Sequence, residues 1–409
     1  MSFEKLRDTV LINDLCAGCG LCGAVCPKDL IDFEGHEPVL RTAPEACGDC
    51  ILCHDVCPGA DPATPAAESH IFGRHRTFSE RWIGIHRKVH HGYSTDPVLF
   101  ERSASGGGIT GTLMAARDRL QLGAVLAVGR STTRPAYAEG VICRTDEEIL
   151  ETCQSSYQLF PYLRKLRRLL QAPEAERIAV AGLACHVQAI RKLQMLDCEI
   201  GERARERIGF IVEAACSSNT LPSGTDAMLR EEVGVTLNDT KRLRYREGSY
   251  PGEIRGQTAD GRDFAFPFWK AVRHLKASKT HRCLSCGDWF SGLADVAVCD
   301  GDQNIFATSQ NGTAPAKYAK ILVRTPLGED VVAWAAATGR MVLWPGSIDD
   351  ANSLGCERKR NRRASYELRG GALPAGPIPG YIDRGPIIDD EFLIPDMPDQ
   401  ARLPDKETQ

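Results

Sequence analysis

The sequence predicts an α/β protein (α+β overall) made of a cysteine-rich N-terminal domain, a larger α/β body and an extended C-terminal tail. Three observations predict this class. Eight cysteines lie between Cys16 and Cys57, and apolar strand-like runs alternate with helical patterns from about residue 84 to 345. The segment Gly371–Pro404 is rich in Pro, Gly and Asp. The predicted boundaries are 1–68 for the first domain, 69–84 for a linker, 85–345 for the body and 346–409 for the tail.

Composition narrows the kind of protein. The 409 residues carry a formal net charge of −4, which gives no reason to expect nucleic acid or an anionic membrane as a partner. No apolar run approaches the roughly 18–20 residues of a membrane span, and Met1–Leu15 lacks the apolar segment of a secretory signal. The 17 cysteines of this long chain therefore favour metal or cluster ligation over disulfides, and predict a reducing, cytoplasmic location.

The first element in the chain is a duplicated cysteine motif. Its copies, Cys16–Pro27 and Cys47–Pro58, both follow the spacing C-x₂-C-x₂-C-x₃-C-P that is typical of bacterial ferredoxins with two [4Fe–4S] clusters. The first three thiolates of a copy wrap one cluster, and the fourth reaches the other. Zinc is the alternative, but a regular double run ending twice in Cys-Pro favours clusters. The predicted ligand sets are Cys16, Cys19, Cys22 and Cys57 for one cluster and Cys26, Cys47, Cys50 and Cys53 for the second.

The Pro/Ala-rich segment Gly59–Ala67 predicts a linker, and the α/β body follows it. Apolar runs that end at glycine predict strands, and apolar residues at helical spacing predict helices. Such alternation indicates a largely buried sheet. The predicted strands are Ala124–Gly129, Ile178–Gly182, Ile208–Val212, Val296–Cys299 and Ala319–Val323, and the predicted helices are Ile109–Leu120 and Val187–Leu193.

A second group of cysteines lies within the body. Cys185 follows one predicted strand, Cys216 ends another, and Cys283 and Cys286 form a C-x₂-C pair. Ends of parallel strands are where α/β proteins place their sites, so these four could hold a third [4Fe–4S] cluster. Alternatively, Cys185 and Cys216 are small buried apolar residues. The remaining cysteines show no partner pattern and are predicted to pack in the core: Cys143, Cys153, Cys198, Cys299 and Cys356.

A glycine-rich stretch, Ser103–Gly108, precedes the predicted helix Ile109–Leu120. Small residues and free backbone amides at a helix N-terminus suit a phosphate or pyrophosphate. The stretch could equally be a flexible turn with a serine N-cap. It does not match G-x-G-x-x-G, so it does not predict a Rossmann site.

Four segments in the same order resemble the beta-subunit family of coenzyme F420 hydrogenases and dehydrogenases, which includes chlorophyll-pathway reductases. The resemblance covers about residues 85–345. The segments are SASGGG at 103–108, GLACHVQAIRKL at 182–193, GFIVEAAC at 209–216 and CLSCGDWFSGLADVAVCDGD at 283–302.

This resemblance implies an FAD-binding catalytic domain behind a ferredoxin-type domain. It implies a third [4Fe–4S] cluster held by Cys185, Cys216, Cys283 and Cys286. It also implies that the glycine-rich stretch lies against the flavin phosphates, and that the Ser-Tyr pair near the family's SKY-like position faces the flavin. The flavin contacts expected from it are Ser103, Ser105, Gly106, Gly107, Gly108, Ser156 and Tyr157.

The expected activity is that of an iron–sulfur flavoprotein oxidoreductase, because FAD couples one-electron carriers to two-electron hydride chemistry. A ferredoxin or another subunit would be the one-electron partner, and an organic molecule or a deazaflavin coenzyme would exchange hydride. The alternative is a non-catalytic electron-relay subunit of a larger complex. No catalytic residue is identified. The candidates for proton transfer are His186, His274, His281 and Lys270, and those for ring stacking are Tyr157, Trp289 and Phe290, although packing roles are more common for such residues.

Overall fold

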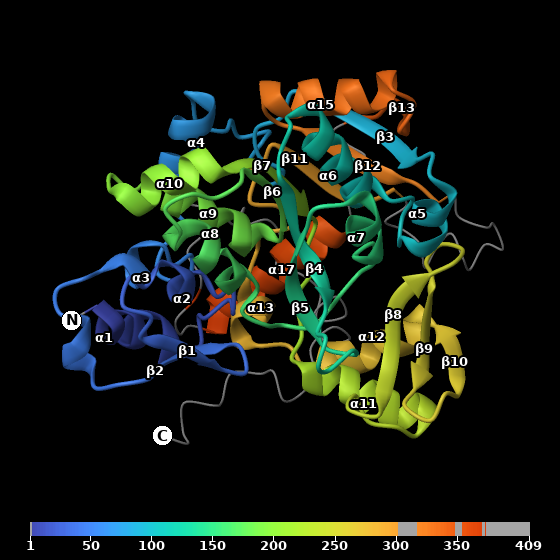
Figure 1. The fold of residues 1–409 in the computed structure, drawn as a ribbon, viewed down its shortest axis with the longest axis horizontal. Coiled ribbons are helices and arrows are strands. Elements are labelled where there is room, and N and C mark those ends of the chain that lie inside the picture. Colours follow the sequence, from blue (N-terminus) through green and yellow to red (C-terminus); the bar gives the residue numbers. More distant parts are fainter. Residues whose placement is uncertain (1, 302–316, 348–353, 370–372, 374–409) are drawn as a thin grey trace.

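The computed structural model describes residues 2–301, 317–347, 354–369 and 373. A central sheet carries helices on both faces, with the N-terminal region at one side and a small antiparallel sheet at the other (Figure 1). This arrangement confirms the predicted mixed α/β class with a cysteine-rich N-terminal region.

The N-terminal region is a set of short helices and one hairpin. Its core is formed by Phe3, Leu6, Val10, Leu15 and Ile31, against which six of the eight motif cysteines pack. In the hairpin, Glu34 pairs with Glu37, so Gly35 occupies the turn, with a positive φ of 62° that suits glycine. The elements are α1 (Ser2–Leu6), η1 (Arg7–Leu11), α2 (Leu21–Val25), β1 (Ile31–Glu34), β2 (Glu37–Leu40), η2 (Pro44–Cys47) and α3 (Leu52–Asp55).

The central sheet has eight strands in the order β13-β3-β12-β11-β7-β6-β4-β5. Its middle is parallel and its edges are antiparallel. The parallel strands are β4 (Ala124–Arg130), β6 (Ile178–Gly182), β7 (Ile208–Ala214) and β11 (Val296–Asp300). The antiparallel strands are β3 (Lys88–Ser94), β5 (Ala138–Cys143), β12 (Ala319–Val323) and β13 (Met341–Pro345).

The parallel strands are mostly apolar because both faces of the sheet are buried, and their charged residues, Arg130, Glu213 and Asp300, lie at or next to the carboxyl ends. In β4, Ala124 and Leu126 pack into one core, while Val125 and Ala127 pack into the other, as strand alternation requires. The helices over the first core are α8 (Arg167–Gln171), α9 (Ala184–Met195) and α10 (Glu199–Arg207), preceded by the 3₁₀ turn η3 (Tyr162–Leu166). Those over the second core are α6 (Gly108–Arg119), α7 (Asp146–Glu151) and α15 (Pro326–Ala337), with α5 (Pro97–Arg102) beside them.

An insertion between β7 and β11 forms a separate antiparallel unit that the sequence did not predict. Its sheet has the order β10-β9-β8 and packs on two helices through a small core that includes Met228, Tyr245 and Ile254. The elements are α11 (Pro222–Val233), β8 (Thr240–Glu247), β9 (Glu253–Thr258), β10 (Asp263–Pro267), α12 (Phe268–Ala277) and then α13 (His281–Ser285).

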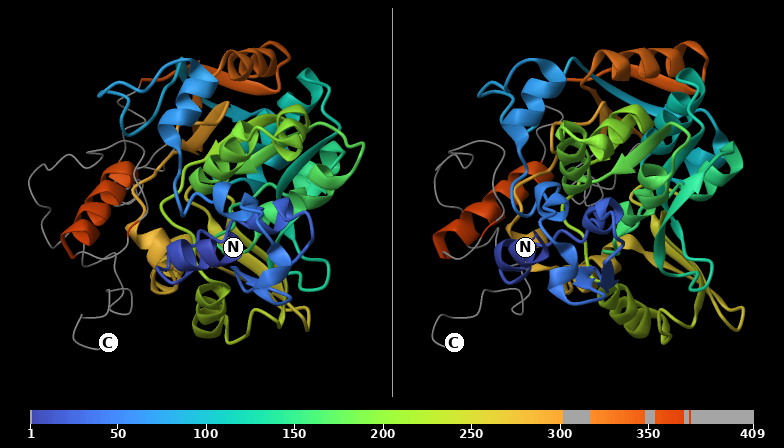
Figure 2. Two further views of the ribbon diagram at one scale, coloured as in Figure 1. Left: turned by 90° about the vertical axis from the view of Figure 1, so that its left-hand side faces the viewer. Right: turned by 60° about the vertical axis from the view of Figure 1, so that its left-hand side comes forward.

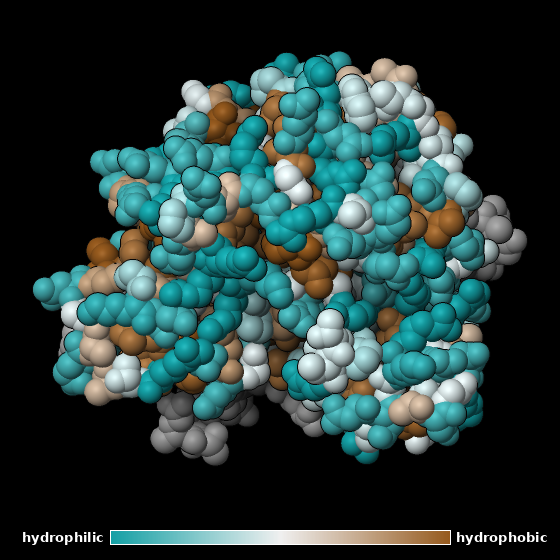
Figure 3. All heavy atoms as spheres, in the orientation of Figure 1, coloured by the Kyte–Doolittle hydropathy of each residue, from teal (hydrophilic) through white to brown (hydrophobic). Residues whose placement is uncertain are grey.

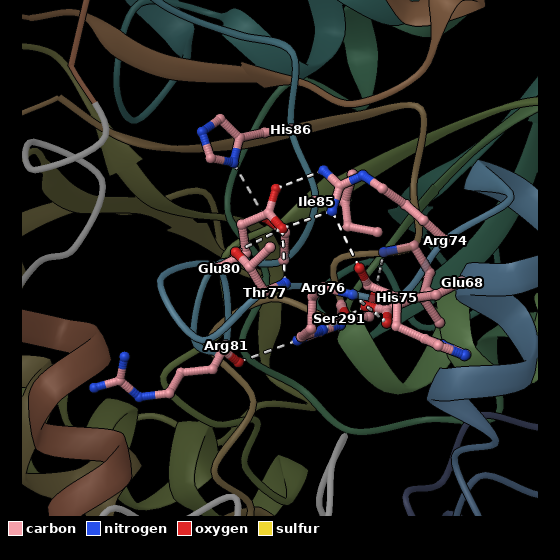
Figure 4. Close-up of polar contacts among 12 residues, drawn as sticks. Glu68, Arg74, His75, Arg76, Thr77, Glu80, Arg81, Ile85, His86 and Ser291 are labelled. Atoms are coloured by element: carbon pink, nitrogen blue, oxygen red, sulfur yellow. Dashed lines mark hydrogen bonds and ion pairs between the residues drawn. The ribbon is translucent and has the colours of Figure 1, made fainter.

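The segment predicted as a linker is tied to the body. Helix α4 (Thr64–Phe72) packs on α9, and its Glu68 is fully buried in an ion pair with Arg76. The Arg76 side chain also donates to the carbonyl of Ser291 at 2.8 Å, as Figure 4 shows. Nearby, Arg74 forms two 2.7 Å hydrogen bonds with the carboxylate of Glu80. The connection between the N-terminal region and the sheet is therefore held in place along its length.

The prediction of an extended tail from residue 346 is wrong for 354–369, which form the helix α17 (Leu354–Arg369). This helix packs on α13, and Figure 2 shows it beside the N-terminal half of the molecule. Its burying face includes Cys356 and Tyr366, which are 1% and 0% exposed. Apart from Leu373, the Pro- and Gly-rich stretch 371–404 lies outside the described residues.

Hydrophilic side chains predominate on the face shown in Figure 3. The most exposed large apolar side chains are Phe78 at 71%, Ile12 at 68% and Trp269 at 54%. Among the helices that the structure describes, none is long and apolar enough to cross a membrane.

Candidate functional site

The first set of N-terminal thiols converges as the motif predicts. Burial raises the pKa of the Cys22 thiol, and the neighbouring thiols of Cys19, Cys16 and Cys57 raise it further. The pKa of Cys19 is raised to about 12, mainly by burial and in addition by the neighbouring thiol of Cys57. These mutual effects place the fourth thiol of the second motif beside the first three thiols of the first motif.

The second set shows the reciprocal arrangement. Burial raises the pKa of Cys47, and the thiols of Cys26 and Cys50 add to this effect. Backbone amides point at the sulfur atoms in both sets: Gly18 N lies 3.4 Å from Cys16 Sγ, and Leu30 N lies 3.3 Å from Cys26 Sγ. Such amide contacts are typical of thiolates that hold iron–sulfur clusters.

The four cysteines of the body also converge. Cys185 lies in the first turn of α9, Cys216 follows β7, and Cys283 and Cys286 lie in and just after α13. Burial raises the pKa of Cys185, and the neighbouring thiols of Cys19 and Cys216 raise it further. Burial raises the pKa of Cys216 to about 11, and the thiols of Cys283 and Cys286 act in the same direction.

Cations accompany this third set. Burial lowers the pKa of Arg282, but the negative charges of Cys286, Asp288 and Cys185 raise it. The net effect is a raised pKa. Lys359 Nζ lies 3.6 Å from Cys286 Sγ, and the amide of Asp288 donates to the same sulfur at 3.4 Å. Neither cation was predicted from the sequence, although Arg282 directly precedes Cys283.

A cavity of about 380 Å³ lies at the carboxyl ends of the parallel strands, next to the third set. Its size falls within the range of small-molecule and cofactor pockets. The segment 152–158, the start of α6 and the loop after β7 form its walls, and both Cys216 and Trp289 line it. The predicted flavin contacts found in its lining are Ser103, Ser105, Gly107, Gly108, Ser156 and Tyr157. Gly106 is not among the lining residues, because its α-carbon faces Tyr93 instead.

The start of α6 can receive an anion. Gly106 and Gly107 have φ values of 76° and 80°, and no side chain caps the helix. The first backbone amides of α6 are therefore available to a phosphate group, as a helix N-terminus allows. In the opposite wall, Ser156 Oγ and Gln154 Oε1 are buried and have no hydrogen-bond partner among the described residues. These donors and acceptors fit a bound cofactor.

Arg246 supplies the positive charge of the cavity. Its Nη1 donates to Asp300 Oδ2 at 2.8 Å, and its guanidinium lies 5.2 Å from the ring centroid of Phe268. Although burial opposes it, the carboxylate of Asp300 raises the pKa of Arg246, which therefore stays charged. The pair comes from two strands 54 positions apart, so no local sequence pattern predicts it.

His186 is the one proton-transfer candidate that lines the cavity among the described residues. Its Nδ1 lies 3.3 Å from the amide of Leu183, and burial lowers its pKa to about 4. The ring is therefore neutral near pH 7. Lys270 and His274 instead lie beside Glu231 and Glu232 on the antiparallel unit.

Of the three candidates for ring stacking, two lie at the cavity and one does not. Tyr157 and Trp289 line the cavity, whereas Phe290 is 2% exposed within a core cluster. His281 packs with its ring centroid 5.5 Å from that of Tyr366.

Three sets of four thiols, the third of which adjoins a cofactor-sized cavity through Cys216, are the arrangement of a redox protein. The chain belongs to the coenzyme F420 hydrogenase/dehydrogenase beta-subunit family, an oxidoreductase family. The description of the family's N-terminal part matches residues 89–167, and that of its C-terminal part matches residues 175–347. This membership confirms the resemblance noted in the sequence.

Individual relatives are distant. The chain is 22% identical over 80% of its length to the coenzyme F420-dependent sulfite reductase of Methanocaldococcus jannaschii, and the match spans 47% of that protein. It is 24% identical to one component of the F(420)H(2) dehydrogenase of Methanosarcina mazei, with 78% of this chain and 82% of that one aligned. A chain from the F420-reducing [NiFe] hydrogenase complex of Methanosarcina barkeri shares the fold, with a TM-score of 0.54 at 18% identity over 71% of this chain and 97% of that one.

Proposed function

We propose that this chain is an iron–sulfur flavoprotein oxidoreductase with two [4Fe–4S] clusters in residues 1–68 and a third, together with FAD, in residues 85–345. One observation carries the proposal: the three thiol sets form a row that ends at the cavity. Cys22 of the first set lies near Cys53 of the second, Cys19 lies near Cys185, and Cys216 lines the cavity. When bound, the clusters carry single electrons and FAD exchanges them for a hydride.

The spacing of the sulfur atoms supports clusters over single zinc ions. A tetrahedral zinc site with Zn–S bonds of about 2.3 Å brings its sulfurs within about 4 Å of one another. Among the described residues, no three of these sulfurs lie within 4.8 Å of one another. Thiolates of a multi-iron cluster bind different iron atoms and lie further apart, so the donor sets fit. The ligands would be Cys16, Cys19, Cys22 and Cys57, then Cys26, Cys47, Cys50 and Cys53, and in the body Cys185, Cys216, Cys283 and Cys286.

The cavity residues have separable roles in this proposal. The first amides of α6, at Gly107 and Gly108, would hold the flavin phosphates. Ser156 would offer its hydroxyl, which has no described partner, to a polar edge of the cofactor. Arg246 would hold negative charge in the cavity, since Asp300 fixes its guanidinium in place. His186, neutral near pH 7, would accept or orient a hydrogen bond rather than carry charge.

Family membership favours a deazaflavin coenzyme of the F420 type as the hydride partner, because the relatives' names refer to it. Another organic hydride acceptor would use the same cavity. The one-electron partner would approach the second set, in which Cys47 and Cys50 are only partly buried. It would be a ferredoxin or a second subunit.

The decisive experiment is to purify the protein without oxygen and to measure iron and flavin per chain. We expect about twelve irons and one FAD, and bleaching of the flavin by the reduced coenzyme. Cys22→Ala and Cys286→Ala should each lose about four irons and keep the flavin, whereas Cys198→Ala, outside all three sets, should lose none. About eight irons without flavin would favour the electron-relay subunit instead.

A further inference from the structure

Helix α17 covers the third thiol set from outside the part of the chain that the family descriptions match. Those descriptions end at residue 347, whereas α17 spans Leu354–Arg369. Cys356 anchors one end in a core cluster with Trp82 and Phe290, and Tyr366 anchors the other against Leu284. The part of α17 between these two anchors therefore lies against residues 282–288.

That stretch presents three buried cations to the thiol set. Lys359, Arg362 and Arg363 are 3%, 5% and 7% exposed. Lys359 Nζ lies 3.6 Å from Cys286 Sγ and donates to the carbonyl of Asp288.

The two arginines hold the backbone around the ligands. Arg362 donates at 2.8 Å to the carbonyls of both Leu284 and Ser217, which neighbour Cys283 and Cys216. Arg363 donates to the carbonyl of Ser285 at 3.2 Å. The helix therefore connects two of the three ligand segments of the third set, the one at Cys216 and the one at Cys283 and Cys286.

Arg282 adds a fourth buried cation from α13, the helix on which α17 packs. It is 3% exposed, and its Nη1 is buried without a hydrogen-bond partner among the described residues. The carboxylate of Asp288 interacts electrostatically with both Arg282 and Lys359, and Glu367 pairs with Arg363. One carboxylate does not balance the buried cations Arg282, Lys359 and Arg362, and an excess of buried positive charge is costly, so this grouping favours an anion at the thiol set.

We propose that α17 and Arg282 form a cationic cap that stabilises the anionic cluster of the third set and favours its reduced state. This inference rests on the proposed third cluster. Four thiolates make an assembled cluster an anion, and reduction adds a further negative charge. Net charge, hydrogen bonds to sulfur and solvent exposure set the potentials of such clusters, and the cap changes all three.

The test compares Lys359→Met with Arg360→Met on the same helix. Arg360 is the matched control because its guanidinium lies 4.7 Å from the ring centroid of Trp82, away from the thiols. Each variant is purified without oxygen, its iron is counted, and its clusters are titrated reductively with detection by electron paramagnetic resonance. The signal that Cys286→Ala removes identifies the third cluster.

We expect Lys359→Met to keep its iron and to shift the reduction equilibrium of that signal at least about tenfold toward the oxidised state, which is about 59 mV for one electron. Arg360→Met should leave it unchanged. Equal shifts in both variants, or none in Lys359→Met, would overturn the cap. If Lys359→Met loses iron, the Lys359→Arg variant, which keeps the positive charge, is measured in its place. If Lys359→Arg retains its iron and the wild-type potential, the cap is supported. If both variants lose iron, the cap is overturned. A wild-type protein with about eight irons would instead reject the third cluster itself.

Discussion

Cys216 belongs to two sites at once, since its thiol joins the third set while the residue also lines the cavity. It comes two residues after β7, where the strand ends and the backbone leaves the sheet. The amide of Cys216 donates to the carbonyl of Trp289 at 3.1 Å, which fixes the cysteine against a second lining residue. A single short loop thus brings a thiolate ligand to the wall of the cavity.

Glu80 gives a residue-level prediction for stability. Both oxygens of its carboxylate bind the guanidinium of Arg74, and Thr77 also donates to it, so that its pKa falls to about 2 (Figure 4). A carboxyl group whose pKa is lower in the folded state contributes stability above its ordinary value near 4.5. That contribution disappears as the pH falls from about 4.5 to about 2.

Glu80→Gln should therefore lower the free energy of unfolding at pH 7, and its difference from wild type should shrink below pH 4.5. Urea denaturation at several pH values measures this difference. Glu206→Gln, at an exposed position on α10, serves as the control. A difference that stays constant down to pH 3 would contradict the assignment.

Local spacing made the N-terminal cysteines predictable, because eight ligands in two equal runs leave few alternatives. The cations beside the thiols and in the cavity were not predictable. Lys192 donates to the carbonyl of Cys57 across 135 positions, and Arg246 reaches Asp300 across 54. Partners so far apart are joined only by the fold, and a lone Lys or Arg in a sequence is usually a surface residue.

At the scale of elements, the turn into α6 depends on glycine. A Cβ atom added to Gly107 would lie 2.7 Å from Leu99 Cγ, and the φ of 80° costs other residues about 1–2 kcal/mol. A Cβ atom added to Gly111, within the same helix, would lie 3.4 Å or more from the side chain of Met341, which is an ordinary van der Waals contact. The two positions therefore make a matched pair.

Gly107→Ala should lower the free energy of unfolding by more than about 1 kcal/mol and reduce flavin retention. Gly111→Ala should be neutral or stabilising, because alanine favours a helix interior over glycine. Chemical denaturation and flavin content per chain measure both effects. Equal stability of the two variants would show that the turn tolerates a side chain.

The strands of the parallel core were predicted to within two residues, because β4, β6, β7 and β11 each begin with an uninterrupted run of apolar residues and glycine. Strand β3, which lies between β13 and β12 and has the sequence KVHHGYS, was missed because it is half-exposed and polar. The three strands of the inserted unit were missed for a similar reason, since charged residues interrupt them. Helix α17 was missed because its buried face carries cations instead of apolar residues, so hydrophobic periodicity gave no signal.

At the scale of the whole molecule, the N-terminal region and the α/β body are joined by a dense interface. The amide of Leu163 donates to the carbonyl of Cys19 at 2.7 Å. The side chain of Arg167 donates to the carbonyl of Cys26 at 2.5 Å, and Arg164 donates to that of Ile31 at 2.7 Å. This attachment keeps the first thiol set next to Cys185.

Arg167→Met should loosen this attachment, since each hydrogen bond to a charged group contributes about 1.5–3 kcal/mol. We expect faster amide hydrogen exchange in residues 21–34 and earlier proteolysis after residue 57, with little change in the central sheet. The control is Arg168→Met, because Arg168 is the adjacent exposed residue. Unchanged exchange in the first variant would mean that apolar packing alone holds the region.

Besides the ion pairs that Asp29 and Asp32 form with Arg164 and Arg167, several acceptors of this interface are main-chain carbonyls, which every amino acid possesses. Arg164, Arg167 and Lys192 bind the carbonyls of Ile31, Cys26, Cys57 and Asp61, and Gln171 binds that of Ala24. Substitutions at the acceptor positions leave these contacts intact as long as the backbone path is kept. Over evolutionary time, acceptor positions outside the thiol sets, such as Ala24 and Ile31, are thus free to drift in sequence, while Asp29, Asp32 and the donors on the body are constrained.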